Sequence, residues 1–204
     1  LIFFFIASRQ TTQQRYDQAK AVYDEGKFQN AITEFQNFII AHPRQDLTEE
    51  AKTLMGLAKV RQQIESATPD FPEGLDQLRI FIRDNSDRED AFEALHPEIV
   101  RHARTIALEA AVTAGKRFDE ELLKISSDAR TILNTYAPKD SPPTETLNQI
   151  EASLRASKAM ILKNSVFKEH LARMEKALSD EDPSKTSPLE AMKARRDLLV
   201  RYPR

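Results

Sequence analysis

Histidines and clustered carboxylates are the side chains of this sequence that could carry acid–base or metal chemistry. His96 and His102 are six residues apart, which does not place them on one helical face at the spacing of metal ligands. Acidic residues cluster at 49–50, 119–121 and 180–182, at predicted helix starts or turns, where carboxylates interact favourably with the helix dipole and solvent. A general acid needs instead a carboxylate in an apolar pocket. We therefore expect neither a metal site nor an acid–base centre.

The residues needed for nucleophilic or phosphate chemistry are missing from the sequence. The chain has no cysteine, which excludes thiolate catalysis and disulfides. The two closest glycines, Gly56 and Gly74, are 18 residues apart, which excludes a glycine-rich phosphate loop. The sequence predicts that the protein is not an enzyme, and that it uses no cofactor and no small-molecule substrate.

The charge balance also argues against nucleic acid as a partner. The chain has 30 basic and 32 acidic residues, for a net charge of −2. Basic residues gather at 101–104 and 193–204, but helical spacing places them on more than one face, and Tyr202 is the only aromatic residue among them, too few to stack bases. We therefore expect a protein or peptide partner.

The composition predicts an all-α fold. Only 4 of the 204 residues are glycine, and the chain is rich in Ala, Leu, Glu, Lys, Arg and Gln. These side chains lose little rotamer freedom in a helix. β-branched residues are too sparse and scattered to predict a sheet.

Residues 9–43 have the pattern of a helical hairpin. Helices are expected over residues 9–24 and 28–41, with Gly26 in the turn, where glycine suits a left-handed cap. The apolar residues of the second helix are spaced by three and four, and Pro43 ends it. At this spacing, core packing rather than a ligand cage is expected for the aromatic residues Tyr16, Tyr23, Phe28, Phe35 and Phe38.

Six positions of this hairpin have the residue types and spacing of a tetratricopeptide repeat: Ala19, Gly26, Phe28, Ala31, Phe35 and Pro43. Arg15 and Gln18 stand where that family has Trp and Leu. The chain thus resembles tetratricopeptide proteins, and its long repeats resemble those of bacterial cell-envelope members, such as the lipoprotein of outer-membrane barrel assembly and division coordinators. The resemblance implies antiparallel hairpins stacked as an irregular right-handed α-solenoid.

The repeat pattern returns twice along the chain. At an offset of 43 residues, the positions of Ala31, Phe35, Phe38 and Ile39 are taken by Gly74, Leu78, Phe81 and Ile82. The helices of this second pair are expected over 48–66 and 73–83. At a further offset of 55, Gly74, Leu78 and Phe81 are followed by Ala129, Leu133 and Tyr136. The third pair is expected over 88–113, interrupted at Pro97, and 118–136, with Gly115 in the turn.

A proline-rich linker over 137–145 divides the chain. Ser141 is expected to cap the next helix, with Pro142 and Pro143 at its start. That helix is predicted to end near residue 163, with further helices over 165–179 and 188–200. We therefore divide the chain into residues 1–8, tetratricopeptide-like hairpins over 9–138, and further helical repeats over 139–204 that continue beyond the fragment.

The sequence opens with seven apolar residues, Leu1 to Ala7, which are too few to cross a bilayer. We interpret residues 1–8 as the end of a truncated signal peptide or membrane anchor, so that membrane anchoring would depend on a missing N-terminal segment. The alternative is an apolar end that packs on the first helix. The expected location is the cell envelope or periplasm, and otherwise the cytoplasm.

Stacked helical pairs present a concave surface, lined mainly by the first helix of each pair, that suits a peptide or partner helix. The function expected is a protein-binding scaffold of the cell envelope. The predicted partner-binding residues are the polar side chains of the first helices: Gln13, Arg15, Gln18, Lys52 and Lys59. The alternatives are a structural spacer in a larger anchored or secreted multidomain protein, whose activity lies outside this chain, and a regulatory helical domain.

Overall fold

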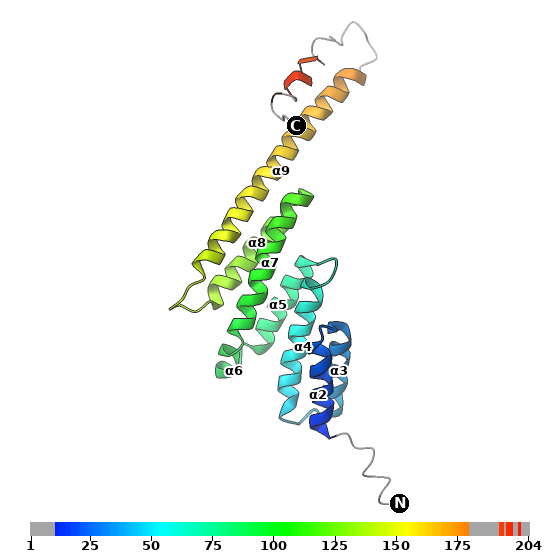
Figure 1. Ribbon diagram of the computed structural model, residues 1–204, viewed down its shortest axis with the longest axis vertical. Coiled ribbons are helices and arrows are strands. Elements are labelled where there is room, and N and C mark those ends of the chain that lie inside the picture. Colours follow the sequence, from blue (N-terminus) through cyan, green and yellow to red (C-terminus); the bar gives the residue numbers. More distant parts are fainter. Residues whose placement is uncertain (1–10, 180–191, 194, 198–199, 201–204) are drawn as a thin grey trace, which may run out of the picture.

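The structure is a computed structural model that describes residues 11–179 together with 192–193, 195–197 and 200. This described part contains eight helices and no strand, so the predicted all-α class is confirmed. Figure 1 shows the helices running back and forth, each packed beside the next, in an elongated stack. No described helix has both the length and the apolar composition that crossing a membrane requires. The predictions for residues 1–8 and 188–200 concern segments outside, or largely outside, the described residues.

The first helical pair is α2 (Thr12–Asp24) and α3 (Phe28–Ala41). Thr11 and Gln14 form a capping box, in which each side chain accepts a hydrogen bond from the other's backbone N–H. Gly26 has a φ of +76°, and the backbone N–H groups of Gly26 and Lys27 donate to carbonyls of the last turn of α2. The predicted turn at Gly26 and the bounds of α3 are confirmed, whereas α2 begins at its cap rather than at residue 9.

Aromatic side chains fill the space between α2 and α3, as predicted. Tyr16 meets Phe38 edge-on with ring centroids 5.8 Å apart, and Tyr23 meets Phe28 at 5.9 Å. Phe35 is fully buried between the two tyrosines. Ala19 of α2 and Ala31 of α3 are buried as well. Their small side chains allow the backbones of α2 and α3 to approach closely.

The second pair is α4 (Leu47–Ile64) and α5 (Phe71–Asn85). Asp70 caps α5 by accepting a hydrogen bond from the Glu73 N–H, and Pro72 lies in the first turn. The prediction that α5 starts at residue 73 is therefore wrong, because the proline sits where a helix tolerates it. A Cβ at Gly74 would lie 2.5 Å from Ile64 Cγ2, so only glycine lets α5 cross α4 there.

The third pair is α7 (His96–Arg117) and α8 (Glu120–Tyr136), preceded by the short α6 (Glu89–Glu93). The predicted break before Pro97 is confirmed. Gly115, however, does not mark the turn: it is buried inside α7, where a Cβ would lie 2.7 Å from Ser157 Oγ. The turn falls at Phe118, which adopts the left-handed conformation, and at Asp119, whose carboxylate caps α8.

Helix α7 is the centre of the stack and packs against α4, α5, α8 and α9. Its buried side chains are mostly small, namely Ala103, Ala107, Ala110, Ala111 and Ala114. Two buried hydroxyls from neighbouring helices donate to its backbone: Ser126 Oγ to the Ala107 carbonyl and Ser157 Oγ to the Ala111 carbonyl, both at 2.6 Å. Small residues thus bring the neighbouring helices close to the α7 backbone.

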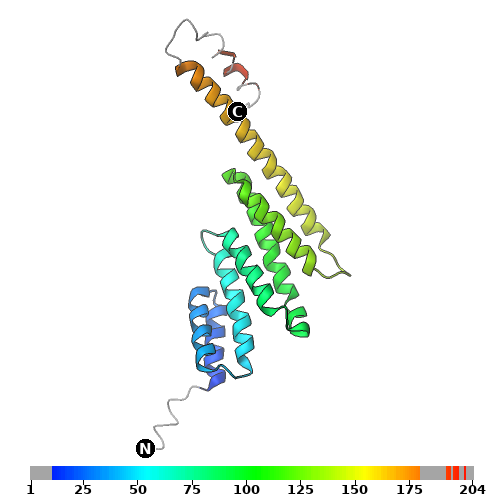
Figure 2. The same cartoon turned by 180° about the vertical axis from the view of Figure 1, so that it is seen from behind.

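The last described helix, α9 (Thr144–Ser179), is a single helix of 36 residues, where two were predicted. Neither glycine nor proline occurs within it, so nothing local stops the helix near residue 163. Its start lies beyond Ser141, Pro142 and Pro143, so the predicted cap at Ser141 is wrong. Its first half packs on α7 and α8, and its second half extends past the end of α7 (Figures 1 and 2).

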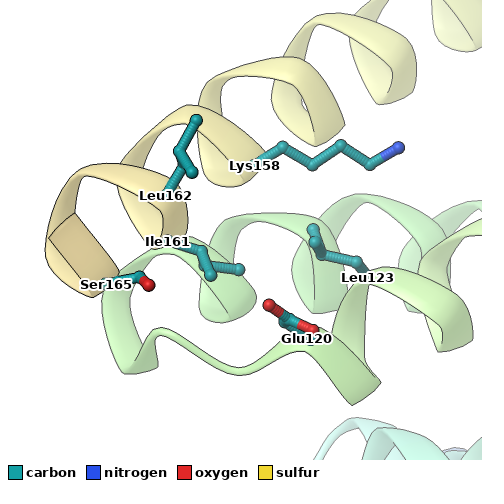
Figure 3. A pocket seen from close by; sticks show the side chains of 6 residues that line it. All are labelled: Glu120, Leu123, Lys158, Ile161, Leu162 and Ser165. Atoms are coloured by element: carbon teal, nitrogen blue, oxygen red, sulfur yellow. The ribbon is translucent and has the colours of Figure 1, made fainter. Parts of the chain in front are cut away.

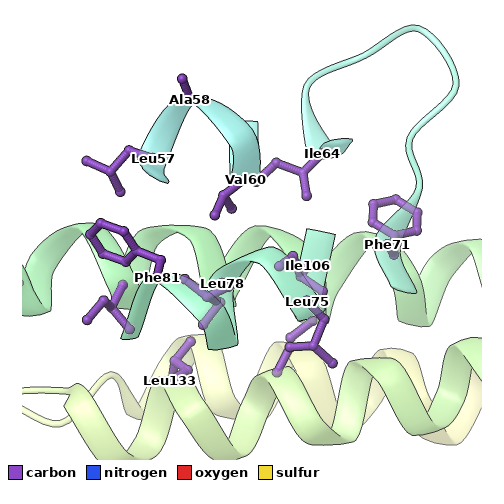
Figure 4. Packing of buried hydrophobic residues seen from close by; sticks show 14 of the residues in the cluster. Leu57, Ala58, Val60, Ile64, Phe71, Leu75, Leu78, Phe81, Ile106 and Leu133 are labelled. Carbon is purple, nitrogen blue, oxygen red and sulfur yellow. The ribbon is translucent and has the colours of Figure 1, made fainter. Parts of the chain in front are cut away.

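One hydrophobic cluster runs from α2 to α9. Figure 4 shows Leu78 and Phe81 of α5 between side chains of α4 on one side and Leu133 of α8 on the other. Positions related by the 43- and 55-residue offsets are buried alike: Phe35, Leu78 and Leu133 are each 0% exposed. The sequence pattern therefore identifies a core position in the second helix of each of three successive pairs.

Candidate functional site

Of the five predicted partner-binding residues, two line a common groove and three do not. Lys52 and Lys59 lie on one face of α4, two helical turns apart, and both line a groove of about 320 Å³. Gln13, Arg15 and Gln18 are exposed on α2 and are not among the groove-lining residues. Arg15 and Gln18 share a face of α2, but Gln13, two residues from Arg15, projects in a different direction.

The groove lies over α4, between α3 and α5, and we call it the α4 groove. Its apolar lining comes from three helices, with Ile39 from α3, Met55 from α4, and Ile80 and Phe81 from α5. Ile80 is 37% exposed at the edge. At Gly56, α4 and α5 approach so closely that a Cβ on this residue would lie 2.8 Å from the Phe81 ring. The floor of the groove is therefore a glycine backbone against an aromatic ring.

One end of the α4 groove is occupied by a polar network. The Glu49 carboxylate accepts a hydrogen bond from Lys52 Nζ at 2.6 Å and lies 3.8 Å from Arg88 Nη1. The hydrogen bond from Lys52 holds the pKa of Glu49 below its usual range. Arg88 also donates to Thr53 Oγ1 and to Asn85 Oδ1, both at 3.1 Å. Each of these polar groups thus has a partner, and the contacts of Arg88 link α4 to the end of α5.

Lys59 is in a different position, two turns along the same face of α4. It is half-buried, it lines the groove beside Met55 and Gln77, and no carboxylate pairs with it among the described residues. A cation beside an apolar surface favours a peptide in which a carboxylate is flanked by apolar side chains. This end of the α4 groove is therefore suited to an acidic and apolar peptide segment.

The buried histidine of α7 is not a candidate catalytic base. His102 is 1% exposed, and burial, together with the nearby Arg101 and Arg61, lowers its pKa to about 3. The ring is therefore neutral at physiological pH. In the part of the chain that the structure describes, no three His, Asp or Glu side chains are grouped so as to hold a metal ion.

A second hollow, of about 360 Å³, lies between the start of α8 and the middle of α9. Figure 3 shows Glu120 and Leu123 of α8 across from Lys158, Ile161 and other α9 residues. The hollow is shallow and open to solvent. It contains no arrangement of groups suited to chemistry.

Sequence reasoning identified the two lysines of the α4 groove but missed its apolar lining. Ile39, Ile80 and Phe81 belong to the helical stripes that predict core, and periodicity within one helix does not show which apolar positions border a gap between helices. The offset pairing of Ile39 with Ile82 could have directed attention to this region, because it aligns α3 with α5.

No protein-family model matches the chain, and neither a curated protein nor a solved structure is similar to it. The geometry of the surface is thus the basis for assigning a function. The α4 groove, unlike the hollow between α8 and α9, combines an apolar floor with a cation that has no ion-pair partner among the described residues, and it is the candidate binding site.

Proposed function

We propose that the protein is a non-enzymatic scaffold that binds a segment of a protein partner in the α4 groove. On this proposal its helical pairs form an irregular tetratricopeptide-like right-handed α-solenoid. Two sets of contacts support it: the first helices of successive pairs touch one another, α2 with α4 and α4 with α7, and each first helix also packs on the second helix of its own pair. Repeat arrays propagate by such nearest-neighbour contacts.

The observation that carries the proposal is the contrast between the two ends of the α4 groove. Glu49 pairs with Lys52 and lies near Arg88 at one end, whereas Lys59 lies beside an apolar floor at the other and has no ion-pair partner among the described residues. A helix or extended segment with an acidic residue next to an aliphatic or aromatic one complements this surface. At about 320 Å³ the groove accommodates a few side chains of a peptide.

The proposed location in the cell envelope rests on the tetratricopeptide resemblance and on the apolar residues 1–8. It is independent of the groove. Fractionation of cells that express the natural gene tests it, with the chain expected in the membrane or periplasmic fraction.

Selection from a random peptide-display library against the purified chain tests the binding function. Enriched peptides are expected to carry an acidic residue beside an apolar one. Their affinity should fall by about tenfold or more in Lys59→Glu and in Ile80→Glu, because the first reverses the unpaired charge and the second places a carboxylate at the apolar edge. Lys124→Glu, at an exposed position of α8, makes the same charge change outside the groove and should bind normally.

Two results would contradict the proposal. One is enrichment of peptides whose affinity is the same for Lys59→Glu, Ile80→Glu and the unaltered chain. The other is a selection that enriches no peptide, which is the result that a structural spacer predicts.

A further inference from the structure

The α4 groove holds a second cation in a fixed position, at the end opposite Lys59. Arg88 lies in the turn between α5 and α6, where its backbone N–H donates to the Asn85 carbonyl and its own carbonyl accepts from the Phe92 N–H. Its side chain is fixed as well, because Nη1 donates to Thr53 Oγ1 on α4 and to Asn85 Oδ1 on α5, both at 3.1 Å. The two helices that form the groove therefore position both the backbone and the side chain of Arg88.

Asn85 anchors Arg88 from inside the fold. Its side chain is 6% exposed, and its Nδ2 donates to the Phe81 carbonyl at 2.8 Å. This bond leaves Oδ1 to accept from Arg88, so both polar atoms of the buried amide are paired, as buried amides require. An arginine held in this way loses little further freedom when it binds a ligand.

The Arg88 guanidinium retains donors for a ligand. A guanidinium has five N–H donors, and within the described residues only Nη1 of Arg88 makes a side-chain hydrogen bond. The nearby carboxylate of Glu49 lies 3.8 Å from Nη1, beyond hydrogen-bond distance, and accepts instead from Lys52 Nζ. Arg88 lines the groove and its side chain is 33% exposed. Its Nε and Nη2 can therefore bind a carboxylate through two parallel hydrogen bonds.

The two cations are well separated along the groove. Arg88 contacts α4 at Thr53 and Glu49, which precede Lys59 by six and ten residues, or about 9 and 15 Å at 1.5 Å per residue. The apolar floor of the groove lies between these two ends. A segment that reaches both cations must therefore carry its two carboxylates on either side of an apolar side chain.

We propose that Arg88 is a specificity-determining residue of the α4 groove, and that the protein segment bound there carries two carboxylates, one for Lys59 and one for Arg88. This inference rests on the proposed peptide-binding function and narrows the partner to a doubly acidic segment with an apolar centre. Asn85 is a positioning residue, because it acts on the segment only through Arg88. Complementary charge at both ends disfavours a singly acidic or a basic segment.

Fluorescence anisotropy with labelled, acetylated and amidated peptides of about 12 residues tests the proposal on the full chain, in two pairs of different spacing. In the first pair two glutamates are seven residues apart, which in a helix is about 10.5 Å along one face. In the second they are four residues apart, which in an extended chain is about 13 Å along one face. Leucine and phenylalanine lie between the glutamates. One member of each pair has glutamine in place of one glutamate. In at least one pair the doubly acidic peptide should bind about tenfold more tightly than the singly acidic one.

Arg88→Gln should abolish this difference between the two peptides, while the singly acidic peptide keeps most of its affinity. Arg88→Lys retains the charge without the fork of donors, so about a threefold difference should remain. Arg104→Gln, at an exposed position of α7, removes an arginine outside the groove and should leave the full difference. Since the measured quantity is a ratio between two peptides, a loss of folded protein affects both alike and does not imitate the expected result.

Glu49→Gln tests the same site without altering Arg88. It removes the carboxylate that lies beside the guanidinium, so the affinity for the doubly acidic peptide should rise by about threefold. If Arg88 and Glu49 serve only to hold α4 and α5 together, the affinity should instead stay the same or fall.

The outcomes separate this inference from the proposed function. Equal affinity for singly and doubly acidic peptides, or the same ratio in Arg88→Gln as in the unaltered chain, would overturn the role of Arg88 and leave peptide binding at Lys59 in place. The same holds if none of these peptides binds but a random library still yields ligands that depend on Lys59. Failure of both the designed peptides and the library would overturn the inference and the proposed function together.

Discussion

The first helical pair and the central helix α7 build their cores from opposite kinds of side chain. Between α2 and α3 the space is filled by rings, with Phe35 buried between Tyr16 and Tyr23. Along α7 the buried positions are mostly alanine and glycine, and hydroxyls from α8 and α9 reach its backbone carbonyls. The core between α2 and α3 depends on large side chains that fill space, whereas the core around α7 depends on small side chains that let the helices approach. The two regions should therefore respond oppositely to truncation and to enlargement.

The largest effect is expected from Phe35→Ala. This ring is 0% exposed and contacts both tyrosines, so its removal leaves a cavity and should lower the free energy of unfolding by about 3–5 kcal/mol. Urea unfolding followed by circular dichroism measures the change. Phe35→Leu, which keeps most of the volume, should lose less than half as much; equal losses would show that volume is not what the first core requires.

Within the α7 core, enlargement should be damaging at Gly115. A Cβ there would lie 2.7 Å from Ser157 Oγ and 3.2 Å from Ser157 Cα, so Gly115→Val forces α7 and α9 apart and should cost about 2–3 kcal/mol. The same unfolding experiment applies. As a control, Val112→Leu enlarges a 44% exposed side chain of the same helix and should have little effect. A stable Gly115→Val variant would remove the contrast between the two cores.

The α7 core also buries a histidine, His102, whereas the first core buries no histidine. Burial lowers the pKa of His102 to about 3, so the histidine binds a proton near pH 6.5 in the unfolded chain but not in the folded chain. Above pH 6.5 His102 is neutral in both the folded and the unfolded chain, so it does not lower the free energy of unfolding. As the pH falls from 6.5 towards 3, protonation of the unfolded chain lowers the free energy of unfolding. Between pH 7 and pH 5 the free energy of unfolding should drop by about 2 kcal/mol from this group.

His102→Gln tests this assignment, because glutamine fills similar space without titrating near neutral pH. The variant should lose most of the difference in stability between pH 7 and pH 5. Val112→Leu, at a 44% exposed position of the same helix, provides the comparison and should leave the pH dependence unchanged. An unaltered pH dependence in His102→Gln would show that His102 does not cause it.

The smallest effect is expected from Ser157→Ala. This change keeps the small size that the α7–α9 contact needs and removes only the 2.6 Å hydrogen bond to the Ala111 carbonyl. The cost should be about 1 kcal/mol in urea unfolding. Ser157→Val tests size as well as the hydroxyl and should cost clearly more. Similar values for the two variants would mean that the hydroxyl matters and the close approach does not.

Features with a local physical cause could be predicted from the sequence. Gly26 ends α2 through its positive φ, Pro97 separates α6 from α7, and the spacing of apolar residues defines α3. The expected turn at Gly115 was wrong because the glycine serves a helix contact, which depends on Ser157, 42 residues further along the chain. The expected end of a helix near residue 163 was wrong because no local signal stops α9.

The candidate sites were predictable only in part, for the same reason. Lys52 and Lys59 could be identified as exposed polar residues of a first helix, but their position over the α4 groove depends on how α3 and α5 flank α4. The left-handed conformation of Phe118 could not be predicted, because the sequence pattern places Phe118 at the start of a helix, whereas in the structure it ends α7. Residues brought together by packing have no signature along one helix.

The continuity of α9 gives the molecule a lever. Ser157 of α9 donates a hydrogen bond to the Ala111 carbonyl of α7. From Ser157 to Ser179 the helix continues unbroken for 22 residues, or about 33 Å at 1.5 Å per residue. A rotation of about 10° at this contact would move the far end by about 6 Å, by simple proportion to that length. A small rotation of α9 about its contact with α7 would therefore produce a larger displacement at the C-terminal end of the helix.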